Sequence, residues 1–173
     1  RGDSAEIWTA TQTPGACYIV AEMITGLSQD KIKVHQPFLG GGFGRRNEVD
    51  YFEQALEASM KVGKPVKLIW SREEDMQHNF HRPAYAAKMT AGLDADGNTV
   101  AWKHKIVGPG IWLSPMRSSR LKDLFAGSDF MNGMQESGVD FHSVQGAKDI
   151  GYDFANLEVE WVQKDFPVPV VFF

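Results

Sequence analysis

The stretch IKVHQPFLGGGFGRR, residues 32–46, determines the organisation that we expect for this chain. Its first four residues alternate apolar and polar side chains and include β-branched ones, which favours a short strand over residues 32–36. Three consecutive glycines and Gly44 follow, so the backbone there can adopt positive φ angles and approach another molecule closely. A strand, a glycine loop and then a helix form a geometry in which backbone N–H groups bind an anion. Residues 40–46 are therefore the first candidate site.

Strands and helices are expected on both sides of this loop. A short strand over residues 6–12 precedes a helix that begins at Pro14 and ends at Gly26, with Thr13 as its cap. A second helix is expected over residues 48–62, because its acidic start, its basic end and the following Gly63 all agree. The helical spacing places one apolar stripe of the first helix on a core: Cys17, Val20, Ala21 and Ile24.

The second half of the chain reads as a hairpin, an irregular connection and a last strand. Alternation over residues 66–70 predicts a strand, and Ser71 with Glu74 has the form of a capping box. Residues 85–93 and 100–106 predict a hairpin, and residues 157–162 a strand. Residues 108–151 lack a sustained period and predict a long irregular connection with one or two short helices.

The expected fold class is therefore α+β: a mixed sheet with two main helices on one face, plus a β-hairpin and a long irregular segment. We expect a single domain over residues 1–173. The chain starts without Met and ends in an apolar string, so it is interpreted as an internal fragment of a larger polypeptide.

Composition excludes several function classes. With 173 residues, 43% of them hydrophobic and 23% charged, the chain is neither disordered nor collagenous. The net charge of -4, without a basic run, argues against a nucleic-acid partner, and no apolar stretch is long enough to predict a transmembrane segment. Cys17 is the single cysteine, which excludes an internal disulfide and a cysteine-built metal site, and inert packing is expected for it.

Taken alone, the glycine loop leaves two interpretations open, an anion site or a tight structural turn. It fits neither common nucleotide motif, because Arg45 stands where a third glycine belongs and no Lys-Ser/Thr pair follows. Arg45 and Arg46 favour anion binding, since guanidinium groups contact anions bidentately. Two arginines at a helix start nevertheless oppose the helix dipole, a conflict that a bound anion would resolve.

Other polar residues give weaker signals. Gln12 ends a strand at a loop position, where either ligand contact or a capping role is expected. His78 and His81 lack a third ligand in any recognised pattern, so no metal ligand is assigned. His104 lies on the apolar face of its strand, where a hydrogen-bonded core histidine is expected.

Three motifs together resemble one family. They are WTATQ (residues 8–12), LGGGFGRR (residues 39–46) and GKPVKLIWSREEDM (residues 63–76), the last leading to Arg82-Pro83. In this order and spacing they resemble the molybdenum-binding large subunit of the xanthine dehydrogenase/aldehyde oxidoreductase family. The resemblance is strongest to its isoquinoline 1-oxidoreductase beta-subunit branch and best over residues 6–107.

The resemblance implies a molybdopterin cofactor, in its cytosine dinucleotide form, held by Gly41, Gly42, Phe43 and Gly44 with Arg45 beside them. Gln12 would hydrogen-bond an oxygen ligand of the molybdenum and so serve as the catalytic residue of this segment. The implied reaction is hydroxylation with water as the oxygen source, with electrons leaving through 2Fe-2S clusters on a partner subunit, joined in some relatives by a cytochrome. The family's glutamate base lies beyond this chain, so the chain alone is expected to be inactive.

The resemblance also bears on the substrate. Xanthine-oxidising members carry Gly-Lys-Glu after the glycine motif, whereas Arg45, Arg46 and Asn47 stand here, which disfavours purines. An isoquinoline-like N-heteroaromatic ring or an aldehyde is expected instead, and both the bacterial periplasm or cell envelope and the cytoplasm stay open as compartments. Two alternatives remain: a phosphate-ligand-binding transferase domain, and a non-catalytic module that docks a partner subunit through residues 108–151.

Overall fold

The computed structural model describes residues 2–113 and 120–170. These residues divide into two compact units, residues 2–80 with 120–124 and residues 81–113 with 125–170. This division does not test whether the two units belong to one domain, so a single domain over residues 1–173 stays a prediction.

The first unit is built on a parallel pair of strands with a helical crossover. Strand β1 (Ala5–Trp8) pairs with β2 (Ile32–His35), and helix α1 (Pro14–Thr25) connects them. Two parallel strands start at the same end of the sheet, so the chain must return along the length of the first strand before the second begins, and α1 makes that return. α1 ends as predicted, since Gly26 has φ +70° and its N–H bonds to the carbonyl of Glu22.

Helix α2 (Asp50–Val62) completes the core of this unit. Phe52 packs with α1 and both strands in one buried cluster, so the two main helices share one face of the sheet, as expected. α2 begins two residues later than predicted because a 3-10 turn, Arg45–Asn47, comes first. It ends at Gly63, which has φ +64°. The other members of the cluster are Ile7, Cys17, Val20, Ala21, Ile32 and Val49.

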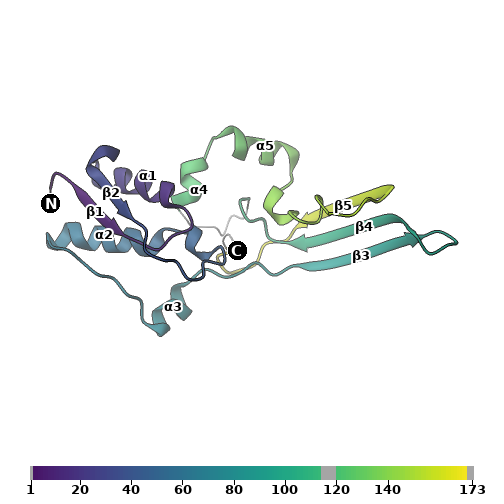
Figure 1. Ribbon diagram of the computed structural model, residues 1–173, viewed down its shortest axis with the longest axis horizontal. Coiled ribbons are helices and arrows are strands. Elements are labelled where there is room, and N and C mark those ends of the chain that lie inside the picture. Colours follow the sequence, from purple (N-terminus) through teal and green to yellow (C-terminus); the bar gives the residue numbers. More distant parts are fainter. Residues whose placement is uncertain (1, 114–119, 171–173) are drawn as a thin grey trace. The chain divides into compact units, whose positions relative to one another are not determined.

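The strand predicted over residues 66–70 is wrong. In Figure 1 the chain between α2 and α3 (Arg72–His78) is drawn without a strand, and residues 65–70 have no regular secondary structure. Alternation creates only the side-chain pattern, and a strand also needs a neighbour with which to pair its backbone. No described strand pairs with this segment. The predicted cap after it is confirmed, since Ser71 Oγ accepts a hydrogen bond from the N–H of Glu74.

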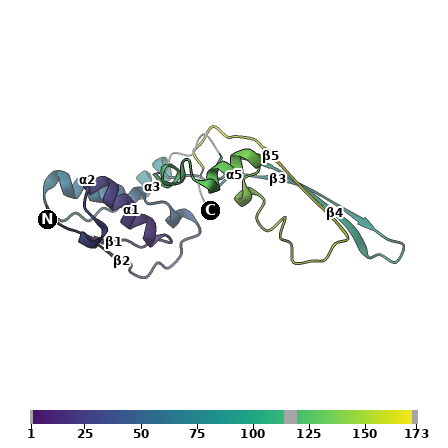
Figure 2. The ribbon, with the colours of Figure 1, turned by 90° about the horizontal axis from the view of Figure 1, so that it is seen from above.

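The second unit contains a three-stranded mixed sheet in the order β3-β4-β5. β3 (Ala86–Leu93) and β4 (Thr99–Gly108) form the predicted antiparallel hairpin, and β5 (Asn156–Gln163) pairs in parallel with β4. Figure 2 shows β3 and β4 running side by side to the hairpin tip. The tip is fixed by Asp94, whose carboxylate accepts from the N–H groups of Asp96 and Asn98.

The prediction of one or two short helices within the connection over residues 108–151 is confirmed. Within its described residues the connection contains α4 (Arg120–Phe125), α5 (Asp129–Ser137) and a 3-10 turn at Phe141–Ser143. α5 is too short for a periodic signal. Ser128 caps it by accepting from the N–H of Met131, and Met131 and Met134 supply its buried contacts.

The α+β class is confirmed. The strands are divided between two sheets instead of one, and the mixed sheet is the three-stranded one. Residues 66–70 lie in sequence between the strands of the two sheets and pair with neither sheet.

Candidate functional site

The glycine loop between β2 and α2 has an unusual backbone. Gly40, Phe43 and Gly44 have φ angles of +72°, +50° and +80°. Phe43 is the one non-glycine residue with positive φ among residues 2–113 and 120–170. A side chain in this region costs about 1–2 kcal/mol. The surrounding contacts must therefore hold the loop in this shape, as is common at binding sites.

Two of the glycines are required by close neighbours. A Cβ atom on Gly42 would lie 2.5 Å from Cδ and 2.7 Å from Cγ of Gln12. A Cβ atom on Gly41 would lie within 3.1 Å of three ring carbons of Phe43. Such distances are far below van der Waals contact, so a side chain at either position would displace its neighbour. Gly42 has no positive φ, and its requirement for glycine is one of space.

Gln12 lies directly against this loop. The side-chain Oε1 of Gln12 accepts a hydrogen bond from the backbone N–H of Gly44 at 2.9 Å, and the backbone N–H of Gln12 donates to the carbonyl of Arg46 at 2.8 Å. Because the Gly44 N–H can only donate, the amide oxygen must face it, and Nε2 is left as the donor on the other side. The structure thus brings together Gln12 and the glycine loop, both of which the sequence singled out.

Two threonines tie the exit of β1 to the end of the loop: Thr11, which the sequence analysis missed, and Thr13, which it expected only to cap α1. Thr11 is fully buried, and its Oγ1 donates to the carbonyl of Arg46 at 2.9 Å. Thr13 does not cap α1 with its side chain. Instead its Oγ1 donates to the carbonyl of Asn47 at 2.9 Å. The alternating threonines at positions 9, 11 and 13 after a strand were a signal of buried hydrogen bonding that could have found them.

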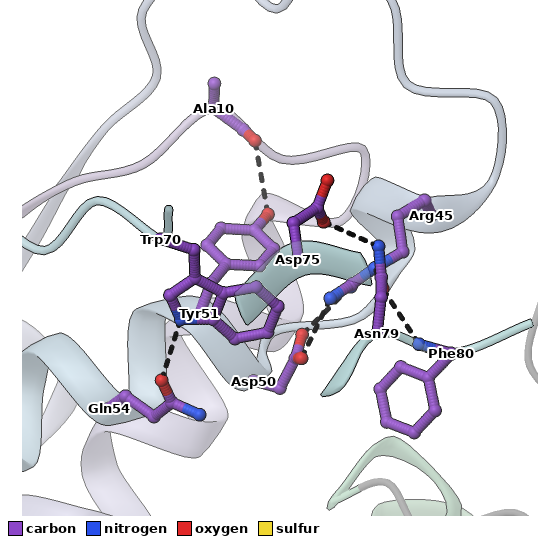
Figure 3. A network of polar contacts seen from close by, with 9 residues as sticks. All are labelled: Ala10, Arg45, Asp50, Tyr51, Gln54, Trp70, Asp75, Asn79 and Phe80. Atoms are coloured by element: carbon purple, nitrogen blue, oxygen red, sulfur yellow. Dashed lines mark hydrogen bonds and ion pairs between the residues drawn. The ribbon is translucent and has the colours of Figure 1, made fainter. Parts of the chain in front are cut away.

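Arg45 forms a pair within the chain, as Figure 3 shows. Its Nη1 and Nη2 donate to the two carboxylate oxygens of Asp50 at 2.9 and 2.8 Å, and its Nε donates to Asn79. Asp50 is the first residue of α2, so its charge also suits the helix dipole. For Arg45, the conflict expected from arginines at a helix start is therefore resolved by Asp50, whereas Arg46 Nη1 donates to the carbonyl of Ala10 at 3.0 Å.

Aromatic rings shield this pair. The guanidinium carbon of Arg45 lies 5.4–5.8 Å from the ring centres of Tyr51, Trp70 and Phe80, and the Arg45 side chain is only 17% exposed. Further hydrogen bonds fix the surroundings in place (Figure 3): Asn79 to Asp75, Trp70 to Gln54, and Tyr51 to the carbonyl of Ala10. Arg45 therefore connects the loop to α2 and to the end of α3. A contact with a cofactor would use the second N–H of Nη1 or Nη2.

The other polar candidates stay outside this site. Burial raises the pKa of the Cys17 thiol to about 11, with a smaller opposing effect from a Thr11 hydrogen bond, so the thiol is inert as expected. His78 pairs with Glu74 at 2.9 Å. Within the described part of the chain, no three His, Cys, Asp or Glu side chains gather as a metal site. His104 differs from expectation, because its buried Nε2 has no hydrogen-bond partner among the described residues.

The loop presents hydrogen-bond donors to its surroundings. Gly41 is exposed and Gly42 is half-buried, and no group in residues 2–113 or 120–170 accepts a hydrogen bond from their N–H groups. Together with Gln12 Nε2 they offer donors at a place where no Cβ stands in the way. This donor set fits an anionic, oxygen-rich ligand of the kind that a pterin phosphate provides. None of the helices that the structure describes has the length and apolar character needed to cross a membrane.

Comparison with known proteins gives consistent matches. The model of the molybdopterin cofactor-binding domain matches residues 1–128. The beta subunit of isoquinoline 1-oxidoreductase from Brevundimonas diminuta is 39% identical over 112 residues, which are 64% of this chain and 14% of that protein. Xanthine dehydrogenase from Emericella nidulans is 31% identical over 98 residues, or 56% of this chain and 7% of that protein. The probable hypoxanthine oxidase XdhD of Escherichia coli is 33% identical over 104 residues, or 59% of this chain and 11% of that protein. The chain thus spans less than a sixth of these relatives.

Proposed function

Because this chain belongs to the molybdopterin cofactor-binding domain family, we propose that its glycine loop and Gln12 hold the cofactor. The observation that carries the proposal is the contact between the two: Gln12 Oε1 is bound to the Gly44 N–H, and the Gln12 side chain lies against Gly42. The backbone of Gly41, Gly42, Phe43 and Gly44 forms the cradle. Gln12 Nε2 donates a hydrogen bond into it.

Each residue has a separate task in this proposal. The N–H groups of Gly41 and Gly42 bind anionic oxygen, because nothing else in the described chain accepts from them. Gln12 orients the ligand through Nε2, and its Oε1 is already used to fix the loop. Arg45 keeps the loop in register with α2 through Asp50, and the N–H groups not used in that pair remain as hydrogen-bond donors beside the cradle. When bound, the cofactor supplies two-electron oxidation of a carbon centre with water as the oxygen source.

We further propose a molybdenum hydroxylase as the whole enzyme. The cofactor is the cytosine dinucleotide form, the substrate is an isoquinoline-like heteroaromatic ring or an aldehyde, and a partner subunit carries the 2Fe-2S clusters. The similarity to the isoquinoline 1-oxidoreductase beta subunit supports this choice, as does the Arg45-Arg46-Asn47 sequence after the glycines. The chain alone is inactive, because it spans a small part of such a protein.

The test uses the full-length polypeptide that contains this chain, purified with its accompanying subunits after growth with molybdate. Molybdenum per chain and cytidine monophosphate released by acid hydrolysis are measured together, and near-equal amounts are expected. Molybdenum without cytidine monophosphate would contradict the dinucleotide form only. Absence of both would contradict the cofactor site, and a retained phosphate ligand without molybdenum would favour a transferase domain.

A further inference from the structure

A second feature of the first unit lies outside the cofactor cradle. A cavity of about 600 Å³, open to solvent on one side, is lined by residues 6–9, by α2 and by residues 65–68. Its wall on α2 includes Phe52 and Leu56, which belong to the core or pack against it, and Ile7 of β1 continues this apolar wall. On the remaining side Val66 and Leu68 are exposed. The cavity is therefore an opening into the hydrophobic core beside the edge of the sheet.

One boundary of this cavity is a strand edge whose backbone is unpaired. The N–H of Thr9 donates to the carbonyl of His35, so Thr9, and by alternation Ile7, direct their backbone groups towards β2. The backbone groups of Glu6 and Trp8 must then face away from β2. No group in the described ranges bonds to them. An edge of this kind is a template for another strand.

Another part of the lining is residues 65–68, which overlap the segment that the sequence predicted to be a strand. Val66 and Leu68 alternate with Lys67 and Ile69, yet no backbone hydrogen bond to another described residue is formed over residues 65–70. Two unpaired extended segments thus border one cavity, which lies on an apolar helix face. A strand placed between them would give hydrogen-bond partners to the unpaired backbone groups of both.

We propose that an extended segment of the longer polypeptide to which this chain belongs inserts between β1 and residues 65–70. The resulting sheet has the order β2, β1, inserted segment, residues 65–70. With a rise of about 3.3 Å per residue, a strand spacing of about 4.8 Å and a layer spacing of about 10 Å, one strand residue fills about 160 Å³, so the cavity holds about four residues. Four residues is also the length of β1.

The occupant has a defined chemistry. Its alternate side chains are apolar, because they face Phe52 and Leu56 of α2, and those between them are polar. The source is the same polypeptide, because the region matched here makes up only 14% of the isoquinoline 1-oxidoreductase beta subunit, and most of such a chain lies outside it. The inference does not depend on the cofactor.

The first measurement is hydrogen exchange of the full-length subunit in its complex, followed by mass spectrometry with residue-level fragmentation. The N–H groups of Glu6 and Trp8 and every second N–H over residues 66–70 are expected to exchange more than about a hundredfold more slowly than unprotected amides. Fast exchange at Glu6 and Trp8 beside slow exchange at Ile7 and Thr9 would overturn the proposal, because the outer edge of β1 would then be free.

The second measurement identifies the neighbour. A photo-crosslinking amino acid, p-benzoylphenylalanine, replaces Lys67, which lines the cavity, or Lys61, an exposed residue of α2 that does not. In the full-length subunit, Lys67→p-benzoylphenylalanine is expected to crosslink to a segment of the same polypeptide outside residues 1–173, and the Lys61 variant is not. Crosslinks from position 67 to residues 5–9 would overturn the proposal by showing direct pairing with β1. Crosslinks to a second copy or to a partner subunit would overturn the assigned source.

Discussion

The side-chain carbonyl of Gln12 accepts a hydrogen bond from the backbone N–H of Gly44 at 2.9 Å, across 32 positions of sequence. This bond joins the exit of β1 to the glycine loop after β2. It also determines which end of the Gln12 amide is free, since the oxygen is used and Nε2 remains to donate. The same side chain fills the space that a Cβ on Gly42 would need. One residue therefore shapes the loop and contributes a donor to it.

Replacing Gly42 by alanine should displace Gln12. The added Cβ would lie 2.5 Å from Gln12 Cδ, so the side chain must move and its bond to Gly44 is lost. We expect a destabilisation of about 1–3 kcal/mol and reduced molybdenum content in the intact subunit, measured by thermal unfolding and metal analysis. Gly15→Ala is the matched control, because nothing lies within 4 Å of a Cβ there. Equal molybdenum content in both variants would contradict the assignment.

Gln12→Glu separates the two tasks of this side chain. A glutamate keeps an oxygen for the Gly44 N–H but has no amide donor. The variant should therefore keep the loop, but its carboxylate repels the anionic ligand, so we expect a lower molybdenum content. Per bound molybdenum, kcat should fall by roughly tenfold to a thousandfold, as for the loss of one oriented donor. Gln12→Ala should lose both functions. Steady-state kinetics alongside molybdenum content provide the test, and unchanged kcat in Gln12→Glu would remove Nε2 from the site.

Arg45→Lys should loosen the loop although the charge is kept. Lysine cannot form the bidentate contact with Asp50 or replace the Nε bond to Asn79. We expect a destabilisation of about 1–3 kcal/mol and faster hydrogen exchange over residues 44–50 in the intact subunit. Arg72→Lys is the control, because its pair with Asp75 leaves the arginine 78% exposed, and less than about 1 kcal/mol is expected there. Equal destabilisation in both variants would show that the shielded pair of Arg45 and Asp50 contributes no more to stability than the exposed pair of Arg72 and Asp75.

Cys17 should make the stability of this unit depend on alkaline pH. Burial raises the pKa of its thiol from 9.0 to about 11, so the folded state keeps a proton that the unfolded state loses. The contribution of the thiol to the free energy of unfolding is therefore fully present below pH 9. It is lost as the pH rises towards 11, by at most about 1.4 kcal/mol per pH unit. The melting temperatures of the intact subunit and of Cys17→Ala, compared at pH 8 and pH 10, give the test. The wild type should lose more between the two values, and identical losses would show that the thiol does not titrate in this way.

Local chemistry allowed most helices and the hairpin to be predicted from sequence. Gly26 and Gly63 end α1 and α2 because a left-handed residue is needed there, and the spacing of Cys17, Val20 and Ala21 identified the buried face. Residues 66–70 failed because alternation describes side chains and says nothing of a pairing partner. The position of α5 was not predicted, although one or two short helices were expected in residues 108–151, because a helix of 9 residues gives too short a period.

For the candidate site, too, the sequence identified single residues but not the contacts between residues that are far apart in the chain. Gln12 and the glycines were found because both are short sequence signals, but their contact joins residues that only the folded chain brings together. The role of Arg45 depended on Asp50 and Asn79, one of them 34 positions away, and no spacing rule predicts such a pair. The positive φ of Phe43 could not be expected, since a non-glycine residue there is held by tertiary contacts.

The crossover from β1 through α1 to β2 has a consequence for how the chain folds. Its strand pairing lies within residues 5–35, and contacts between residues close in sequence form fastest because little loop entropy is lost. The glycine loop depends on Gln12, which lies within this crossover, and on Asp50, which follows β2. During synthesis the sheet and α1 can therefore form first, and the loop acquires its shape only when α2 has emerged and docked.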